Sequence, residues 1–202
     1  MVDRMQIFNR TRPWTQTWTD TNHEIETQLH QYLIRQVDEQ ALRRLDPDRA
    51  KEEVRKAVRQ LASQLFPTLV GDDKEEVVER VVNDVLGFGP IQPLLDDPTV
   101  SEVMVNAPDE VYYERDGVLY KSEINFRDVA HVYQVIDKIV SAIGRHVDEA
   151  SPMVDARLPD GSRVNIIIPP LCPRSPTVTI RKFRSDRYMM ADLIRVGTLT
   201  EE

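Results

Sequence analysis

A cluster of positive charge between Arg157 and Arg187 is the part of this sequence best suited to chemistry. The segment holds seven cations against two acids, a local net charge of +5, in a 202-residue chain whose formal net charge is −8. Arginine binds the oxygens of phosphates and carboxylates in a bidentate manner and keeps its charge at any physiological pH. The cluster therefore indicates a surface that faces an anion. Its cations are Arg157, Arg163, Arg174, Arg181, Lys182, Arg184 and Arg187.

Two of these arginines flank a predicted hairpin turn. Arg157 and Arg163 lie on either side of Asp160-Gly161. This dipeptide favours a tight turn because glycine adopts a positive φ without strain. The spacing is expected to bring both guanidinium groups near the same edge of a sheet.

A third arginine, Arg181, falls on the next predicted strand, with Lys182 and Phe183 beside it. Two interpretations of the arginines stay open from the residues alone. Charged side chains at a solvated sheet edge discourage aggregation, and the arginines then have no ligand. Alternatively, they form an anion clamp for a ligand that is held mainly elsewhere.

No other phosphate-binding, metal or nucleophilic pattern accompanies the arginines. None of the seven glycines is followed by lysine, so the sequence has no G-x-x-x-x-G-K-[ST] loop. The segment Gly87-Phe88-Gly89 lacks the third glycine of a dinucleotide loop and follows a predicted helix. We therefore predict no catalytic residue and no metal site, and we interpret the charged helix faces as solvated. The histidines are scattered, at His23, His30, His131 and His146.

Composition limits the classes of protein to consider. The fractions of apolar and charged residues, 41% and 30%, are typical of a soluble globular chain. The sequence has neither an apolar run long enough to span a membrane nor the apolar core of a signal peptide. A single cysteine, Cys172, excludes an internal disulfide and favours a reducing, cytoplasmic location. The net negative charge argues against a general nucleic-acid binder.

The first half of the chain is predicted to be a three-helix bundle over residues 21–87, after a flexible tail at 1–20. Exposed Trp14 and Trp18 in the tail alternatively form a hook for a partner. Apolar residues recur at helical spacing in each predicted helix. The helices span residues 22–46, 47–66 and about 72–86.

The second half, residues 88–187, is predicted to be an antiparallel sheet of five or six strands with one long helix packed on it. The fold class is therefore α+β, with the helical bundle first and the sheet after it. Two glycines and three prolines in residues 87–98 mark the boundary between the halves. The predicted strands are 102–106, 110–115 and 118–121, followed by a helix at 128–144, the hairpin and a last strand. A short helix is expected at 191–196.

Three stretches carry a resemblance to a known family: GFGPIQPLLDDPTVSEVMVNAPDEVYYERDG, GRHVDEASPMVDARLPDGSRVNIIIPPL and TVTIRKF. In this order and with these gaps they resemble the N-terminal half of the secretion ATPase superfamily, the hexameric motors of type II and type IV secretion and of pilus assembly. The resemblance covers about residues 75–202 and is nearest to the CpaF-like ATPases of the Tad/Flp pilus. It implies a PAS-like fold for residues 88–187. The helical bundle resembles the extra N-terminal domain of the CpaF-like branch.

The resemblance also implies a role for the arginines. In the family, the N-terminal domain folds over ATP and Mg²⁺ held by the catalytic domain, and its arginines approach the phosphates. The match points first to Arg157 and Arg163, while Arg181, Lys182 and Phe183 match the strand that borders the nucleotide and the domain linker. Residues 188–202 would be the linker to a catalytic domain that begins soon after Glu202. The chain thus resembles a truncated form or a natural fragment, from which we expect no ATP hydrolysis and no tight nucleotide binding.

The partners implied by the resemblance are the catalytic domain, neighbouring subunits of a hexamer, and inner-membrane platform proteins, with no nucleic acid. The location would be cytoplasmic, peripheral to the inner membrane through these partners. For this chain alone we expect a monomer or a weak dimer. Two alternatives remain: a stand-alone adaptor that binds a protein through the helical bundle, or an anion-binding or nucleic-acid-binding adaptor. The second lacks the aromatic ladder that stacks bases.

Overall fold

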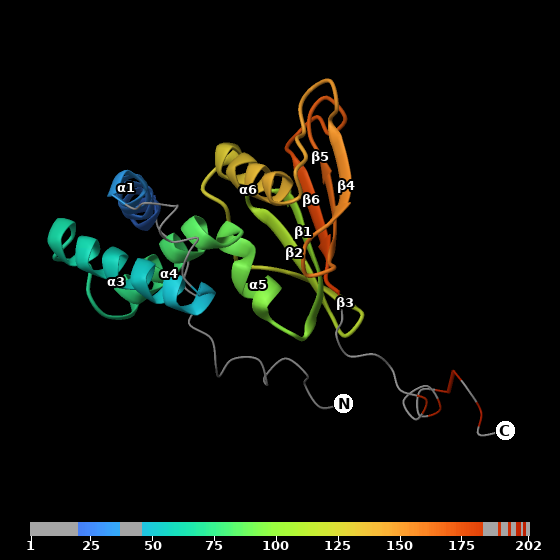
Figure 1. Ribbon diagram of the computed structural model, residues 1–202, viewed down its shortest axis with the longest axis horizontal. Helices are drawn as coiled ribbons and strands as arrows, with labels where there is room; N and C mark the ends of the chain where they lie inside the picture. The colour runs from blue at the N-terminus through green and yellow to red at the C-terminus, as the bar shows by residue number, and fades with distance from the viewer. Residues whose placement is uncertain are drawn as a thin grey trace.

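The computed structural model describes residues 20–36 and 46–183, together with the single positions 190, 194, 197, 198 and 200. Within these residues the chain is α+β. Three helices come first and a six-stranded antiparallel sheet follows, with one long helix packed on the sheet (Figure 1). The predicted fold class is therefore confirmed. The predicted tail with Trp14 and Trp18, Arg184, Arg187 and nearly all of the predicted linker lie outside the described residues.

The first three helices are α1 (Asp20–Gln36), α3 (Pro47–Leu65) and α4 (Gly71–Leu86). The predicted first helix is confirmed up to Gln36, and its expected continuation to residue 46 lies outside the described residues. Helix α3 begins as predicted, because the Asp46 side chain accepts a hydrogen bond from the Asp48 backbone N–H and Pro47 is the first helical residue.

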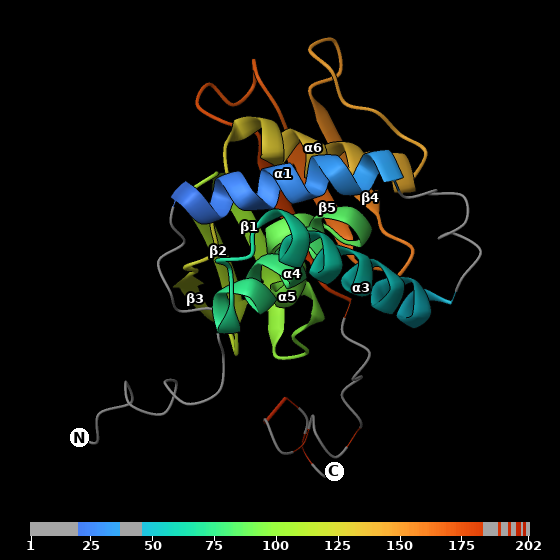
Figure 2. The same cartoon turned by 90° about the vertical axis from the view of Figure 1, so that its left-hand side faces the viewer.

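A hydrophobic core joins these three helices into one unit, which we call the helical unit. Helix α1 lies across α4 and also contacts α3 (Figure 2). Each helix contributes its apolar stripe, and burial of one such aliphatic side chain stabilises the fold by roughly 1.5–3 kcal/mol. The buried members are Leu29, Leu33, Val54, Val58, Ala62, Leu69, Val77, Val78, Val81 and Val82.

The chain leaves α4 through a short 3₁₀ helix, η1 (Gly89–Ile91), and a single turn of helix, α5 (Gln92–Asp96). Gly89 has a φ of +61°, and a Cβ atom there would lie 2.9 Å from Val135 Cγ2 and 3.1 Å from Asp84 Oδ1. Only glycine fits this position without displacing a neighbour. Gly89 therefore allows a close passage of the chain between α4 and the residues near Val135.

The sheet has the strand order β3-β2-β1-β6-β5-β4, and all its neighbouring strands are antiparallel. The last strand is inserted between the first and the fifth, so the two hairpin regions meet at β6. The three predicted strands near residues 100–121 are confirmed, and β1 begins two residues earlier than expected. The strands are β1 (Val100–Ala107), β2 (Glu110–Arg115), β3 (Val118–Lys121), β4 (Met153–Arg157), β5 (Arg163–Ile167) and β6 (Thr177–Arg181).

Helices cover one face of the sheet, and no described element covers the other. Helix α6 (Val129–Ala142) begins at Asp128, whose carboxylate accepts a hydrogen bond of 2.7 Å from the His131 N–H. The apolar side of α6 packs on alternate strand residues in a second core, separate from that of the helical unit. We call the sheet with α5 and α6 the sheet unit. In Figure 1 the helices lie on one side of the sheet, and the opposite side is its open face.

Truncation of a buried residue of the central strand tests this layering. Ile180 on β6 is 1% exposed, so Ile180→Ala is expected to lower the free energy of unfolding by about 2–5 kcal/mol. Leu119 on the edge strand β3 is 57% exposed, and Leu119→Ala is expected to change it by only about 0.5 kcal/mol. Urea denaturation followed by circular dichroism measures both. Equal losses would contradict the assignment of the covered face.

Candidate functional site: an arginine row and a buried polar cluster

Three of the predicted arginines lie side by side on the open face of the sheet. Arg157 of β4 is directly opposite Arg163 of β5, and Arg163 is directly opposite Arg181 of β6. All three side chains are exposed. Directly opposite residues in a sheet have Cβ atoms about 4.5–5.5 Å apart. The expected proximity of Arg157 and Arg163 is confirmed, and Arg181 extends the pair to what we call the arginine row.

The sign of the charge reverses further along the same register. Arg181 is opposite Glu102 of β1, which is in turn opposite Glu114 of β2. The cations therefore occupy β4, β5 and β6, and the acids occupy β1 and β2. Like charges on directly opposite residues destabilise a sheet. Repulsion within the arginine row therefore lowers the stability of the fold, and an anion bound over β5 would offset this repulsion.

Arg163 already has one carboxylate partner, Asp155 on β4. Its Nε donates to Asp155 Oδ1 at 3.0 Å and its Nη2 donates to Asp155 Oδ2 at 2.6 Å. The hydrogen bond from Arg163 lowers the pKa of Asp155. Both side chains are exposed to solvent, which screens their attraction. The pair orients the guanidinium group while leaving it accessible to an incoming anion.

Lys182 and Phe183 are placed differently from the arginine row. Lys182 Nζ donates to the Asp97 carbonyl oxygen at 2.6 Å, and burial lowers the pKa of this lysine. Lys182 thus contacts the residue that follows α5. The Phe183 N–H donates to Ser162 Oγ at 3.1 Å, and the ring lies against Gly161 in the hairpin turn. The exposed ring covers the turn that joins β4 to β5.

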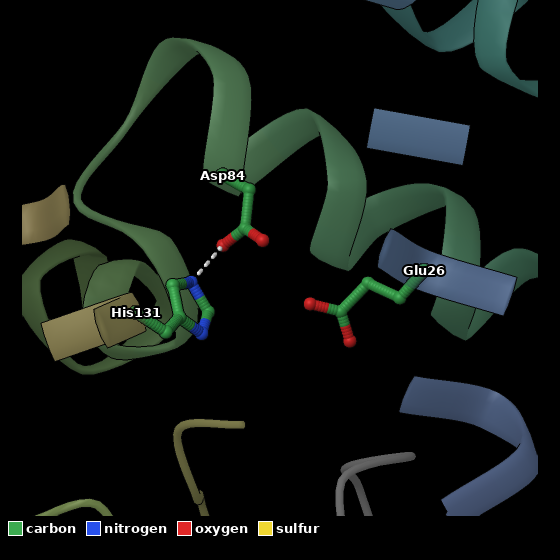
Figure 3. A group of neighbouring side chains, drawn as sticks. All are labelled: Glu26, Asp84 and His131. Atoms are coloured by element: carbon green, nitrogen blue, oxygen red, sulfur yellow. Dashed lines mark hydrogen bonds and ion pairs between the residues drawn. The ribbon is translucent and has the colours of Figure 1, made fainter. Parts of the chain in front are cut away.

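A second group of charged residues lies between the helical unit and the sheet unit. We call it the buried polar cluster: Glu26 of α1, Asp84 of α4, Arg127, and His131 and Lys138 of α6. Glu26, Asp84 and His131 are only 1%, 4% and 3% exposed. Figure 3 shows their side chains turned toward one another from three different helices. The sequence-based interpretation of these helix faces as solvated is wrong for Glu26 and Asp84.

A signal for this burial was present in the sequence. Glu26 precedes Leu29 by three residues, and Asp84 follows Val81 by three, so each acid continues the apolar stripe of its helix. An acid inside an apolar stripe is buried only if a cation reaches it from another element. That cation is Arg127, which lies 43 residues from Asp84 and 101 from Glu26 along the chain.

The contacts within the buried polar cluster are nearly complete. Arg127 Nη1 donates to Asp84 Oδ2 at 2.7 Å and also to Glu26 Oε1. His131 Nε2 lies 3.1 Å from Asp84 Oδ1, while its Nδ1 faces the Arg127 backbone N–H at 3.4 Å. Lys138 Nζ donates to the carbonyl oxygens of Asp84, Val85 and Gly87. These oxygens lie at the C-terminal end of α4, where helix carbonyls lack partners within the helix.

The cluster has the composition of a metal site but not its chemistry. Ligand atoms of Glu26, Asp84 and His131 lie within 4.8 Å of one another. The backbone N–H at His131 Nδ1 assigns the proton to Nε2, which then donates to Asp84. Neither ring nitrogen keeps a lone pair for a metal, and the Arg127 guanidinium already lies between the carboxylates. The cation that the two carboxylates share in this structure is therefore the Arg127 guanidinium group.

Electrostatics within the cluster favour the ionised form of Asp84. Burial by itself would raise the pKa of this carboxyl group. The hydrogen bond from His131 and the charge of Arg127 outweigh burial and hold the pKa of Asp84 well below its usual range. The two carboxylates in turn raise the pKa of Arg127 against the effect of its own burial.

Residues 84–202 match the family described as Type II/IV secretion system protein. Because the match covers more than half of the chain, this protein belongs to that family.

Individual relatives agree with this assignment. The type IV secretion system protein VirB11 of Brucella suis is 31% identical over 124 residues, covering 61% of this chain and 34% of its own length. An uncharacterised protein of Methanocaldococcus jannaschii is 31% identical over 134 residues, covering 65% of this chain and 24% of its own. The chain thus spans about a third or less of these relatives.

A solved structure shares the fold. It is the VirB11 ATPase of the Brucella suis type IV secretion system in complex with sulphate, 31% identical and superposing with a TM-score of 0.50. The superposition covers 56% of this chain and 35% of the VirB11 chain. The likeness supports the α+β architecture of the N-terminal part of such an ATPase.

The lowered pKa of Asp84 predicts a specific pH dependence. A carboxyl group with a folded-state pKa below its unfolded value of about 3.9 stabilises the fold above that value and loses this effect as pH falls. Asp84→Asn should therefore reduce the free energy of unfolding most near pH 7, and the difference from wild type should shrink below about pH 4. Urea denaturation at a series of pH values from about 2.5 to about 7 measures this difference in the free energy of unfolding.

The exposed ion pair of Arg163 and Asp155 supplies the control for this experiment. Asp155→Asn removes a carboxylate of the same kind, also with a lowered pKa, but in a solvent-screened position. Its effect on unfolding is expected to be much smaller at every pH. A stability difference between wild type and Asp84→Asn that stays constant from pH 7 to acid would refute the electrostatic role of Asp84.

Proposed function

We propose that this chain is the N-terminal region of a hexameric motor ATPase of type IV secretion or of Tad/Flp pilus assembly. In the complete motor, its PAS-like sheet unit covers ATP and Mg²⁺ held by the catalytic domain and contributes arginines to the nucleotide. Membership of the secretion family and the likeness to the VirB11 ATPase support the motor assignment. The arginine row is the observation that carries the nucleotide role.

The geometry of the arginine row suits a phosphate chain. Three guanidinium groups stand on adjacent strands of one face, and Asp155, the carboxylate that pairs with Arg163, is exposed. Guanidinium matches phosphate oxygens bidentately and stays charged throughout a catalytic cycle. Charge supplied by a mobile domain to a transferring phosphoryl group stabilises the transition state, as an arginine finger does.

The solved relative lends support from its ligand. The VirB11 structure was obtained in complex with sulphate, a tetrahedral anion that resembles phosphate in charge and shape. We extend anion binding to this chain on the basis of its own arginine row. Arg157 and Arg163 are proposed to face the phosphates, with Arg181 beside them. Lys182 and Phe183 contribute indirectly, by holding the end of β6 against Asp97 and the hairpin turn.

The setting of such a motor follows from the same proposal. Its partners would be its own catalytic domain, neighbouring subunits of the hexamer and inner-membrane platform proteins. It would lie in the cytoplasm, peripheral to the inner membrane through those partners. Across the part of the chain that the structure describes, no helix combines the length and the apolar character needed to cross a membrane.

One observation favours a second role, that of a protein-interaction adaptor. The family match begins at residue 84, so α1, α3 and most of α4 lie outside it. The helical unit nevertheless has its own complete core. A unit that lies outside the matched residues and has its own hydrophobic core is suited to bind a partner specific to one branch of the family.

Substitution in the complete motor tests the nucleotide role. Arg157→Ala and Arg163→Ala are each expected to lower kcat/KM for ATP by at least about tenfold, equivalent to roughly 1.4 kcal/mol of transition-state stabilisation. Arg174→Ala is the matched control, because Arg174 belongs to the same charge cluster but lies outside the row, 3.7 Å from Glu110. Unchanged turnover in both row variants would reject the proposal.

The isolated chain gives an independent measurement. It is expected to show no ATP hydrolysis, because a phosphoryl-transfer site also needs a backbone cradle and a metal site. Binding of ATP should be weak, salt-dependent and confined to the arginine row, since exposed charges are screened over about 10 Å at 0.1 M salt. Changes in the NMR chemical shifts of backbone amides on titration with ATP locate the binding site. Steady ATP turnover by the purified chain, free of contaminating ATPases, would contradict this expectation.

A further inference from the structure

The helical unit and the sheet unit meet through a polar layer. Each unit has a hydrophobic core, and the two cores share no buried residue. The charged contacts between them come from α1 and α4 on one side and from Arg127 and α6 on the other. Polar contacts between buried surfaces are directional, because each donor and acceptor must be matched. The relative orientation of the units therefore depends on the buried polar cluster.

Arg127 is the central member of this layer. Its Nη1 atom bridges Glu26 of α1 and Asp84 of α4, two helices of the same unit. The other oxygen of Glu26 lies 3.8 Å from His23 Nδ1, a longer contact than that with Arg127. Removal of one partner from a buried ion pair leaves an uncompensated charge, which is strongly destabilising. With Arg127 absent, two buried carboxylates would lose their shared cation.

The connection between the units leaves little room for rotation. Lys138 of α6 binds the carbonyl oxygens at the end of α4, just before the link to η1. The Gly89 backbone passes so close to Val135 and Asp84 that a Cβ would lie 2.9 and 3.1 Å from their side chains. A swing of the helical unit about this link would break the Lys138 contacts and disturb this close passage.

We propose that the buried polar cluster holds the helical unit and the sheet unit together as one rigid body, with Arg127 as the positioning residue. The helical unit then moves with the sheet, and a partner bound to its outer surface is displaced whenever the sheet unit rotates. This inference concerns the chain itself and holds whether or not the arginine row binds nucleotide.

Pulsed electron paramagnetic resonance of the whole chain tests the proposal. Spin labels are attached at Lys56→Cys on α3 and Leu119→Cys on β3, both exposed positions, in a Cys172→Ser background. The wild-type cluster is expected to give one narrow distance distribution. Arg127→Met, which keeps an unbranched apolar stem but removes the guanidinium group and its charge, should broaden this distribution at least twofold in width.

A matched control removes an arginine within one unit. Arg59 of α3 pairs with Glu75 of α4, inside the helical unit and exposed to solvent. Arg59→Met should leave the distance distribution as narrow as in the wild type. Hydrogen exchange of the amides of β1, β5 and β6 reports separately whether the sheet core stays folded in each variant. Broadening with unchanged sheet protection supports a loss of interdomain orientation.

Other outcomes would overturn the proposal. A broad distribution in the wild type, or an unchanged one in Arg127→Met, contradicts rigid attachment through Arg127. If Arg127→Met does not fold, Glu26→Gln keeps the shape of the side chain and removes one charge. It should broaden the distribution by a smaller factor, and no broadening would again contradict the proposal. Broadening of the wild-type distribution by EDTA would show that a metal ion, and not Arg127, joins the units.

Discussion

The arrangement of this protein depends on one guanidinium group shared by two buried carboxylates. Arg127 precedes α6 in the chain, and its partners lie on α1 and α4. The two hydrophobic cores share no buried residue, so burial within each core does not set the orientation of one unit relative to the other. The charge contacts supply direction where the hydrophobic effect has none. This division of roles agrees with the use of buried polar groups for specificity more than for net stability.

The arginine row depends on a different constraint, the strand order. The last strand, β6, pairs with both β1 and β5, so Arg181 has Arg163 on one side and Glu102 on the other. A meander in sequence order would have placed β4 beside β3 and left Arg181 on an edge. The pairing of β4, β5 and β6 places three cations on neighbouring strands, and the insertion of β6 beside β1 ends this row at Glu102. The β5–β6 pairing also places the hairpin turn at Gly161 against Phe183, which follows β6.

Local sequence signals predicted much of the fold. The Asp160-Gly161 dipeptide correctly indicated a hairpin in which Arg157 and Arg163 are neighbours. The connection is longer than a two-residue turn, because the Leu158 N–H donates to the Ser162 carbonyl oxygen at 2.8 Å, and this longer connection sets the observed register. Helical periodicity predicted α3 well, including its start at Pro47. The strand order could not be read in this way, because it is decided by contacts between residues some 80 positions apart, such as Glu102 and Arg181. The buried polar cluster was missed for the same reason: the partner that makes Glu26 and Asp84 tolerable in an apolar stripe is remote in sequence.

The reversal of charge along the open face has a geometric consequence. Neighbouring strands are separated by about 4.8 Å, so a bound anion displaced by one strand from β6 toward β1 exchanges an arginine for Glu102. The anion would thus pass from attraction to repulsion over one strand spacing, which is less than the length of a triphosphate. An anion bound on this face would therefore be selected by its lateral position as well as by its charge. A nucleotide seated out of alignment would meet its own sign of charge.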